Sequence, residues 1–178
     1  MTRPSAKDEP ISGGFRVVVS RERATLPTGR EMLIDIVHHP GAAAVVPFTG
    51  DGEVALIRQY RHAAGGMILE VPAGKLDAGE PPEQCAAREL AEEAGFSAGR
   101  LAALGSIWTT PGFTDEVIHL FAAFDLTRVA SRPEDDEVIE VIRVPLAHAL
   151  DLVWRGELRD AKSALALIHA ARHVGQLA

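Results

Sequence analysis

Three glutamates near the middle of the chain have the spacing that says most about chemistry. Glu89, Glu92 and Glu93 stand at positions i, i+3 and i+4 of a predicted helix, so their carboxylates share one face. Like charges at this spacing repel by about 0.2–0.5 kcal/mol per pair. They also lie at the negative end of the helix dipole, where each costs about 0.3–1 kcal/mol. Bound Mg2+ or Mn2+ would compensate and would bring a phosphate-bearing substrate, whereas a solvated acidic face is the alternative.

The glutamates end a longer motif that includes glycine and arginine. It reads Gly74-x5-Glu80-x7-Arg88-Glu89-Leu90-x-Glu92-Glu93-x-Gly95-Phe96. This pattern resembles the signature of the Nudix hydrolases, GX5EX7REUXEEXGU, in which U is a bulky apolar residue. Every defined position matches, although Phe96 is an uncommon final residue. The resemblance implies a metal-dependent hydrolase of nucleoside diphosphate derivatives.

The resemblance also implies which residues bind metal. Glu89, Glu92 and Glu93 are the expected carboxylate ligands, and Glu92 and Glu93 are further assigned to catalysis. The backbone carbonyl of Ala73 is an additional ligand that the family commonly uses. Gly74 is expected to let the backbone turn, so that this carbonyl points at the metal.

The motif helix is predicted from about Pro82 to Ala94. Proline is tolerated where a helix begins, and Gly95 suits the left-handed residue that ends one. In the family's pattern Arg88 pairs with Glu80 and fixes the preceding loop against the helix. Both residues are therefore expected to be structural.

The segment after the motif resembles one branch of the family. Pro111 follows Gly95 by sixteen residues in the run Pro-Gly-Phe-Thr-Asp-Glu. From about residue 15 onward the chain resembles the ADP-ribose pyrophosphatases. The shared features are this spacing, the chain length, the N-terminal strands and residues 58–61. The resemblance implies Mg2+-dependent hydrolysis of ADP-ribose to AMP and ribose 5-phosphate. It places Gly112 and Phe113 near the substrate, whereas an ordinary tight turn is the alternative.

A second acidic segment, residues 133–137, precedes a predicted strand. Its proline and adjacent carboxylates disfavour regular structure, so a loop is expected. In ADP-ribose pyrophosphatases the loop at this place supplies a glutamate that binds metal or activates water. Glu137 is the candidate for this role and Asp135 is its substitute, whereas a solvated loop is the alternative.

Two arginines and one glutamate upstream of the motif are candidates for substrate contacts. Arg58 and Arg61 fall on opposite faces of their predicted strand, so only one of them can readily serve the site. The resemblance favours Arg61, near a terminal phosphate or the diphosphate. Glu70 either accepts a hydrogen bond from a substrate hydroxyl or is a buried structural acid.

The order of the predicted elements indicates an α/β/α sandwich around a mixed sheet. Residues 1–39 form a small β extension and residues 40–178 form the hydrolase domain. Because a hairpin has little core of its own, we expect it to pack on a second subunit in a homodimer. The predicted strands are residues 15–20, 32–38, 42–48, 53–60, 67–71, 101–108, 116–124 and 138–144, and the helices after the motif are Leu146–Trp154 and Ala161–His173, the second capped by Asp160.

Composition excludes several classes of protein. The chain has 178 residues, 47% of them hydrophobic, which suffices for a proper core. A net charge of −7 without a Lys/Arg cluster argues against nucleic-acid partners. The seven histidines lack zinc-ligand spacing, and the single cysteine, Cys85, is expected to be inert packing. The absence of a hydrophobic leader in residues 1–10 and of an 18-residue apolar run predicts a cytoplasmic protein without membrane contact.

Two alternative functions remain open from the sequence. One is hydrolysis of another nucleoside diphosphate derivative, such as a nucleotide sugar, NADH or a dinucleoside polyphosphate. The other is a catalytically silent domain that binds ADP-ribose as a sensor. Silent relatives are expected to lose carboxylates from the motif, and this chain keeps all of them.

Overall fold

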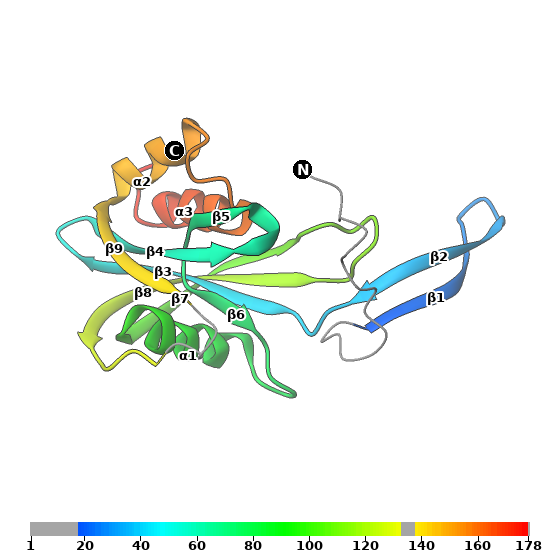
Figure 1. Ribbon diagram of the computed structural model, residues 1–178, viewed down its shortest axis with the longest axis horizontal. Helices are drawn as coiled ribbons and strands as arrows, with labels where there is room; N and C mark the ends of the chain where they lie inside the picture. Colours follow the sequence, from blue (N-terminus) through cyan, green and yellow to red (C-terminus); the bar gives the residue numbers. More distant parts are fainter. Residues whose placement is uncertain (1–17, 133–137, 178) are drawn as a thin grey trace.

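A twisted mixed sheet with helices on both faces forms the body of the molecule, and a long hairpin projects from it (Figure 1). The computed structural model describes residues 18–132 and 138–177. The arrangement is the α/β/α sandwich with a small β extension that the sequence predicts.

The sheet of the body is organised around its third strand. The strands are β3 (Ala42–Gly50), β4 (Glu53–Arg61), β5 (Gly66–Glu70), β6 (Ala73–Lys75), β7 (Phe96–Trp108), β8 (Val117–Arg128) and β9 (Ile139–Pro145). They are ordered β5-β4-β3-β8-β7, with β6 paired to β3 and β9 paired to β4. The pairing of β3 with β8 is parallel, whereas β3 pairs with β6 and β4 in the antiparallel sense. The sheet is therefore mixed, with β3 at its centre.

Helices cover the two faces of this sheet. Helix α1 (Pro82–Ala94) lies on one face, and α2 (Leu146–Trp154) and α3 (Ala161–His173) lie on the other (Figure 1). Because side chains alternate along a strand, β3 supplies both cores. Its even-numbered residues from Ala42 to Val46 pack under α2 and α3, and the odd-numbered ones pack under α1. None of the helices in the described residues combines the length and the apolar composition that a membrane crossing needs.

The ends of two helices confirm the signals read from the sequence. Helix α1 has the predicted bounds, and Gly95 ends it in the left-handed conformation with φ of 69°. The carboxylate of Asp160 caps α3 by accepting a hydrogen bond from the Ser163 N–H.

Cys85 is fully buried within α1, and this burial raises the pKa of its thiol to about 12. The thiol is therefore protonated at neutral pH and packs as an inert side chain.

Four strands differ from the prediction. Strand β1 continues to Thr25 rather than ending at residue 20, and β8 continues to Arg128 rather than ending at residue 124. Strand β7 begins at Phe96 rather than near residue 101, because Gly95 turns the chain from the helix directly into the strand. Strand β6 has only three residues and pairs with β3. A strand of this length has too few residues to show a pattern in the sequence.

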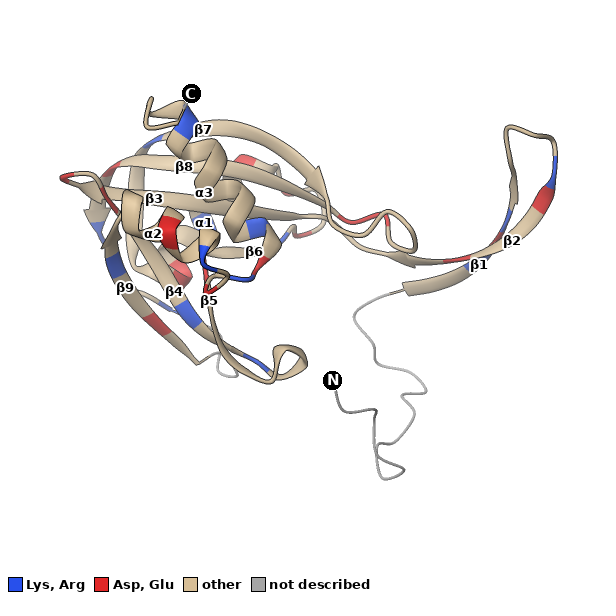
Figure 2. Ribbon diagram, turned by 90° about the horizontal axis from the view of Figure 1, so that it is seen from above, with Lys and Arg blue, Asp and Glu red and all other residues tan. Residues whose placement is uncertain are grey.

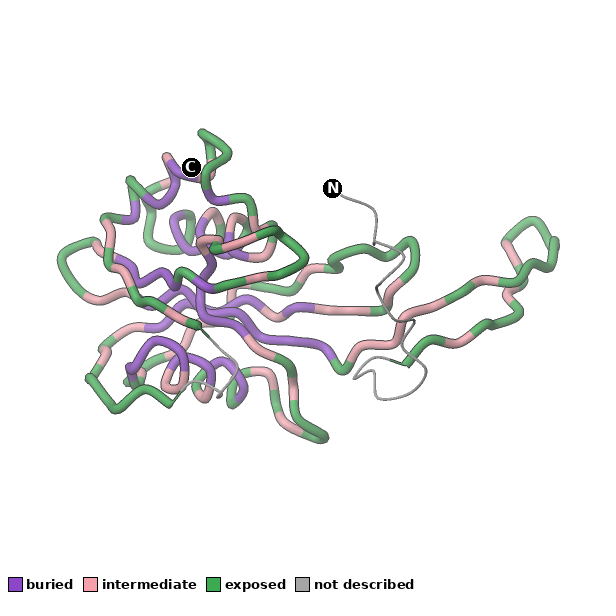
Figure 3. The backbone as a smooth tube through the Cα atoms, in the orientation of Figure 1, coloured by how far each residue is buried: buried purple, intermediate pink, exposed green. Residues whose placement is uncertain are grey.

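The hairpin is a separate two-stranded sheet of β1 (Val18–Thr25) and β2 (Glu31–His38). Its strands pair over their whole length. Figures 1 and 2 show it projecting from the body, and Figure 3 shows its described residues as exposed or intermediate. Val18, Val19 and Leu33 each expose more than half of their surface. The division of the chain near residue 39 and the packing of the hairpin on a second subunit stay predictions.

A cluster of charged side chains ties the hairpin to the body. His38 Nδ1 lies 2.7 Å from Asp115 Oδ2, and His38 Nε2 lies 3.0 Å from Glu22 Oε1. The backbone N–H of His39 donates to Asp115 Oδ1 at 2.8 Å. Since Asp115 lies between β7 and β8, one carboxylate joins β2 to the body.

We expect His38 to titrate above its ordinary pKa. The hydrogen bond with Asp115 is the largest cause, and the nearby Glu22 acts in the same direction. Because the folded pKa lies above the unfolded value of about 6.5, the interaction stabilises the fold fully below that pH, and the stabilisation is lost as pH rises through the folded pKa. NMR titration of the imidazole protons measures this pKa. Asp115→Asn should lower it, and an identical pKa in both proteins would contradict the assignment.

Candidate active site

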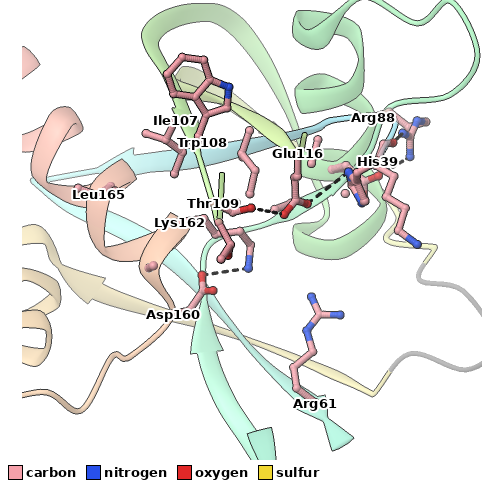
Figure 4. A pocket seen from close by; sticks show the side chains of 18 of the residues that line it. His39, Arg61, Arg88, Ile107, Trp108, Thr109, Glu116, Asp160, Lys162 and Leu165 are labelled. Atoms are coloured by element: carbon pink, nitrogen blue, oxygen red, sulfur yellow. Dashed lines mark hydrogen bonds and ion pairs between the residues drawn. The ribbon is translucent and has the colours of Figure 1, made fainter. Parts of the chain in front are cut away.

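A cleft of about 950 Å³ opens between α1, the end of β7 and the start of α3 (Figure 4). Each of these elements contributes a different chemistry. Helix α1 provides carboxylates, the start of α3 provides an acid and a base, and the end of β7 provides apolar side chains. The residues that carry these properties are Glu89, Glu92 and Arg88 from α1, Asp160, Lys162 and Leu165 from the α3 region, and Ile107 and Trp108 from β7.

The guanidinium of Arg88 connects three of the motif glutamates. It holds Glu80 with two hydrogen bonds of 2.9 and 3.0 Å, so the ion pair expected between these residues is present. Its Nη1 atom also donates to Glu89 at 2.5 Å and to Glu92 at 3.0 Å. The hydrogen bond from Arg88 is the main reason that the pKa of Glu80 falls to about 2. The repulsion between the helix carboxylates is therefore compensated in part by an arginine, which the sequence argument assigned to metal alone.

The donor atoms at this wall fit a hard divalent cation. Glu89, Glu92 and Ala73 all line the cleft. The two carboxylates already bracket one positive charge, the Nη1 of Arg88. Among residues 18–132 and 138–177, no three His, Cys, Asp or Glu side chains are gathered around one point. Mg2+ is usually held by one or two carboxylates together with water and substrate phosphates, so the donors present are sufficient in kind and number.

Glu93 occupies a different position from its two neighbours. Its side chain is buried, with 3% of the residue exposed, and it lies behind the wall of the cleft. Its Oε2 accepts a hydrogen bond of 2.8 Å from the backbone N–H of Ala73. This contact fixes the residue whose carbonyl is the expected ligand. The roles of Glu93 as a metal ligand and catalyst stay predictions.

Gly74 is required for a reason other than the expected turn. It lies within β6, opposite Ala43 of β3, and its φ is not in the left-handed region. A Cβ atom at this position would lie only 1.8 Å from Oε1 of Glu89. The glycine therefore makes room for the carboxylate of Glu89 against the strand.

Arg61 lines the cleft, and Glu70 lies buried behind it. Arg61 donates two hydrogen bonds to Glu70, at 2.9 and 3.0 Å, and Lys162 donates a third at 2.6 Å. Burial raises the pKa of Glu70, but the hydrogen bonds from Arg61 and the charge of Lys162 lower it by more. Glu70 is thus an ionised, buried acid. Arg58 pairs with Glu140 at 3.5 Å instead, so of these two arginines it is Arg61 that lines the cleft.

The loop that follows β7 reaches the cleft through other residues than the expected ones. Gly112 and Phe113 are not part of the cleft wall, and the Phe113 carbonyl accepts a hydrogen bond of 2.7 Å from the Val37 N–H. Thr109 and Glu116 line the cleft in their place, joined by a hydrogen bond of 2.7 Å. The substrate roles of Gly112 and Phe113 stay predictions. The proposed acids Glu137 and Asp135 lie outside the described residues.

Sequence reasoning missed most of the wall that faces away from α1. Lys162 had a signal that was available: it lies in the first turn of α3, where a positive charge opposes the helix dipole. Asp160 was predicted only as a cap. His39, whose ring nitrogen lies 3.3 Å from Glu116, had no spacing signal because it comes from a distant part of the chain (Figure 4).

We expect Gly74→Ala to destabilise the protein. The added Cβ would collide with the Glu89 carboxylate, which could move away only by giving up its hydrogen bond with Arg88, so we expect a cost near the lower end of the about 1–3 kcal/mol typical of overpacking. Urea unfolding measures the change in free energy. Gly112→Ala is the matched control, because nothing lies within 4 Å of its Cβ position. Equal stability of the two variants would contradict the expected cost of this collision.

Comparisons with known proteins agree with the motif and the fold. The NUDIX domain model matches residues 37–166. The chain is 41% identical to an ADP-ribose pyrophosphatase of Bacillus subtilis (strain 168) over 89% of this chain and 87% of that protein. It is 37% identical to a methanol dehydrogenase activator of Bacillus methanolicus over 90% of this chain and 88% of that protein. The crystal structure of an ADP compounds hydrolase superposes with a TM-score of 0.81 at 25% identity, covering 95% and 94% of the two chains. The chain belongs to the Nudix family.

Proposed function

We propose that this protein hydrolyses the pyrophosphate bond of ADP-ribose to give AMP and ribose 5-phosphate, with Mg2+ as cofactor and Mn2+ as a possible substitute. The observation that carries the proposal is the pairing of carboxylates and cations in one cleft. Glu89 and Glu92 suit a metal-bound diphosphate, and Arg61 adds a cation to the same cleft. The names of the Bacillus subtilis pyrophosphatase and of the ADP compounds hydrolase support this choice of substrate.

The residues of the cleft divide the work of the reaction. Glu89 and Glu92, with the Ala73 carbonyl, would hold the cofactor. Glu93 remains a further candidate ligand and accepts the hydrogen bond that fixes Ala73. When bound, Mg2+ neutralises phosphate oxygens and lowers the pKa of a coordinated water. Arg61 donates hydrogen bonds to the phosphates, with its own position set by Glu70.

Hydrolysis then forms one bond to phosphorus and breaks another. A water molecule attacks one phosphorus in line, and its proton passes to Glu137. If the loop aligns differently with that of the family, Asp135 takes the proton instead. The bridging oxygen leaves with the second phosphoryl group, so the products are two monophosphates. Catalysis is electrostatic and positional, without a covalent intermediate on the protein.

The quaternary structure and cellular location belong to the same proposal. The exposed apolar residues Val18, Val19 and Leu33 of the hairpin suit packing on a second copy, which makes a homodimer. The small-molecule diphosphate is the substrate, and neither nucleic acid nor a membrane is a proposed partner. A cytoplasmic location agrees with a nucleotide substrate.

The first test is product analysis with a panel of diphosphates. We expect ADP-ribose with Mg2+ to yield AMP and ribose 5-phosphate, and chelation of the metal to stop the reaction. A higher kcat/KM for a nucleotide sugar, NADH or a dinucleoside polyphosphate would move the assignment to that substrate. Binding of ADP-ribose with no product would support the silent sensor instead.

Glu92→Gln tests the role of the α1 carboxylates that line the cleft. It should lower kcat by at least about 10²-fold, the size typical for losing one electrostatic stabiliser of a transition state. Circular dichroism and urea unfolding should show an intact fold, because Glu92 is partly exposed. Glu83→Gln, at an exposed position of the same helix away from the cleft, is the control and should keep full activity. Near-normal Mg2+-dependent turnover of Glu92→Gln would refute the proposed site.

Glu137→Gln tests the assignment of the water-activating acid. We expect kcat to fall by orders of magnitude while KM changes little, because the acid acts on water rather than on the substrate. Asp135→Asn, two residues away, is the matched control. If Asp135→Asn is the slow variant and Glu137→Gln turns over normally, the role belongs to Asp135.

A further inference from the structure

Four charged residues form one wall of the cleft at the start of α3, here called the paired wall: Arg61, Glu70, Asp160 and Lys162. Lys162 Nζ donates to Glu70 at 2.6 Å and to Asp160 at 2.9 Å. Arg61 donates twice to the same Glu70. Two cations therefore meet two carboxylates, and the wall has no net charge. Glu70 is buried, while Arg61, Asp160 and Lys162 line the cleft (Figure 4).

The paired wall still offers both kinds of hydrogen-bonding atom to the cleft. The Lys162 ammonium has three N–H groups, and two of them are used by Glu70 and Asp160. Asp160 uses Oδ2 for its contacts with Lys162 and Ser163. The other carboxylate oxygen of Asp160, Oδ1, accepts no hydrogen bond from any of the described residues. A donor and an acceptor thus lie side by side on α3, since Lys162 and Asp160 are in contact.

These properties suit a hydroxyl group better than a phosphate. A sugar hydroxyl both donates and accepts, so it can pair with Asp160 Oδ1 and Lys162 Nζ at once. A phosphate only accepts, and the carboxylate of Asp160 would repel it. Since Asp160 and Lys162 together carry no net charge, a phosphate beside this pair gains no compensating attraction, whereas Arg61 is the member of the wall that serves the diphosphate.

We propose that Asp160 and Lys162 bind the hydroxyls of the uncharged sugar beyond the pyrophosphate, and that the neutrality of the paired wall discriminates against substrates with a third phosphate. The inference rests on the proposed function and refines it. Among the alternatives, it favours ADP-ribose and nucleotide sugars over dinucleoside polyphosphates. Asp160 and Lys162 become specificity residues in addition to their contacts within the fold.

A purely structural role is the competing explanation. Asp160 caps α3, and Ser163 Oγ, which donates to Asp160, accepts a hydrogen bond from the Val71 N–H at 2.9 Å. Loss of this scaffold would weaken every ligand alike. The sugar subsite instead predicts that removal of the negative charge and removal of the positive charge change ligand preference in opposite directions.

The experiment compares ADP-ribose with ATP, which carries a third phosphate in place of the second sugar. Dissociation constants are measured by calorimetry with Mg2+ at fixed ionic strength, using the α,β-methylene analogues of both nucleotides so that turnover does not interfere. We use the ratio Kd(ATP)/Kd(ADP-ribose), because contributions from the unchanged carboxylates of α1 cancel between variants. Asp160→Asn should lower this ratio about fivefold or more, and Lys162→Met should raise it.

Two controls separate charge from folding. Asparagine is as good a helix cap as aspartate, so Asp160→Asn should keep the unfolding midpoint of the original protein. Asp151→Asn removes an equivalent charge from α2, where Asp151 pairs with Arg155 away from the cleft, and should leave the ratio unchanged.

The outcomes are distinguishable from those of the proposed function. If Asp160→Asn and Lys162→Met change both dissociation constants by the same factor, the paired wall is only structural and the inference is wrong. If the original protein hydrolyses ADP-ribose but the ratio does not respond, the proposed function stands without this subsite. If the original protein neither binds nor hydrolyses ADP-ribose, both proposals fail.

Discussion

The hydrogen bonds of the Arg88 guanidinium hold together the acidic side of the cleft that α1 forms. One planar group joins Glu80 in the loop before α1 to Glu89 and Glu92 on the helix, and it also donates to the Lys75 carbonyl at the end of β6. Loop, helix and strand are thereby fixed by fork-shaped hydrogen bonds that a lysine has too few directed donors to reproduce. The three carboxylates lie close together around this one cation, and its hydrogen bond lowers the pKa of Glu80 to about 2. The proposed site for a metal-bound diphosphate uses that arrangement.

Much of the fold follows from local signals in the sequence. Helix α1 begins at Pro82 and ends before Gly95, where proline and glycine have clear conformational meanings. Asp160 likewise marks the start of α3. Strand β6 was not predicted, because its three residues are defined by pairing with β3 rather than by a sequence pattern of their own. Local chemistry specifies where the helices begin and end, whereas the bounds of strands such as β6 and β7 depend on their tertiary partners.

The sequence predicted some of the residues that line the candidate site, but not how deeply each one is buried or which residues it contacts. Helical spacing places Glu89, Glu92 and Glu93 on one face, yet only the packing of α1 on β6 decides that Glu93 is buried against the Ala73 N–H. Gly74 was identified for its backbone freedom, although its missing side chain matters more. The rule that flags acids at the end of α1 also flags Lys162 at the start of α3. His39 and Glu116 meet only through the tertiary fold, so no local rule finds them.

The segment between β7 and β8 has a mechanical consequence. Its two ends, at Thr109 and Glu116, form part of the cleft, while its middle is clamped to β2 through Phe113 and Asp115. The cleft wall and the hairpin thus share one short stretch of backbone, so any displacement of β2 relative to the body would change the position of Thr109 and Glu116 as well.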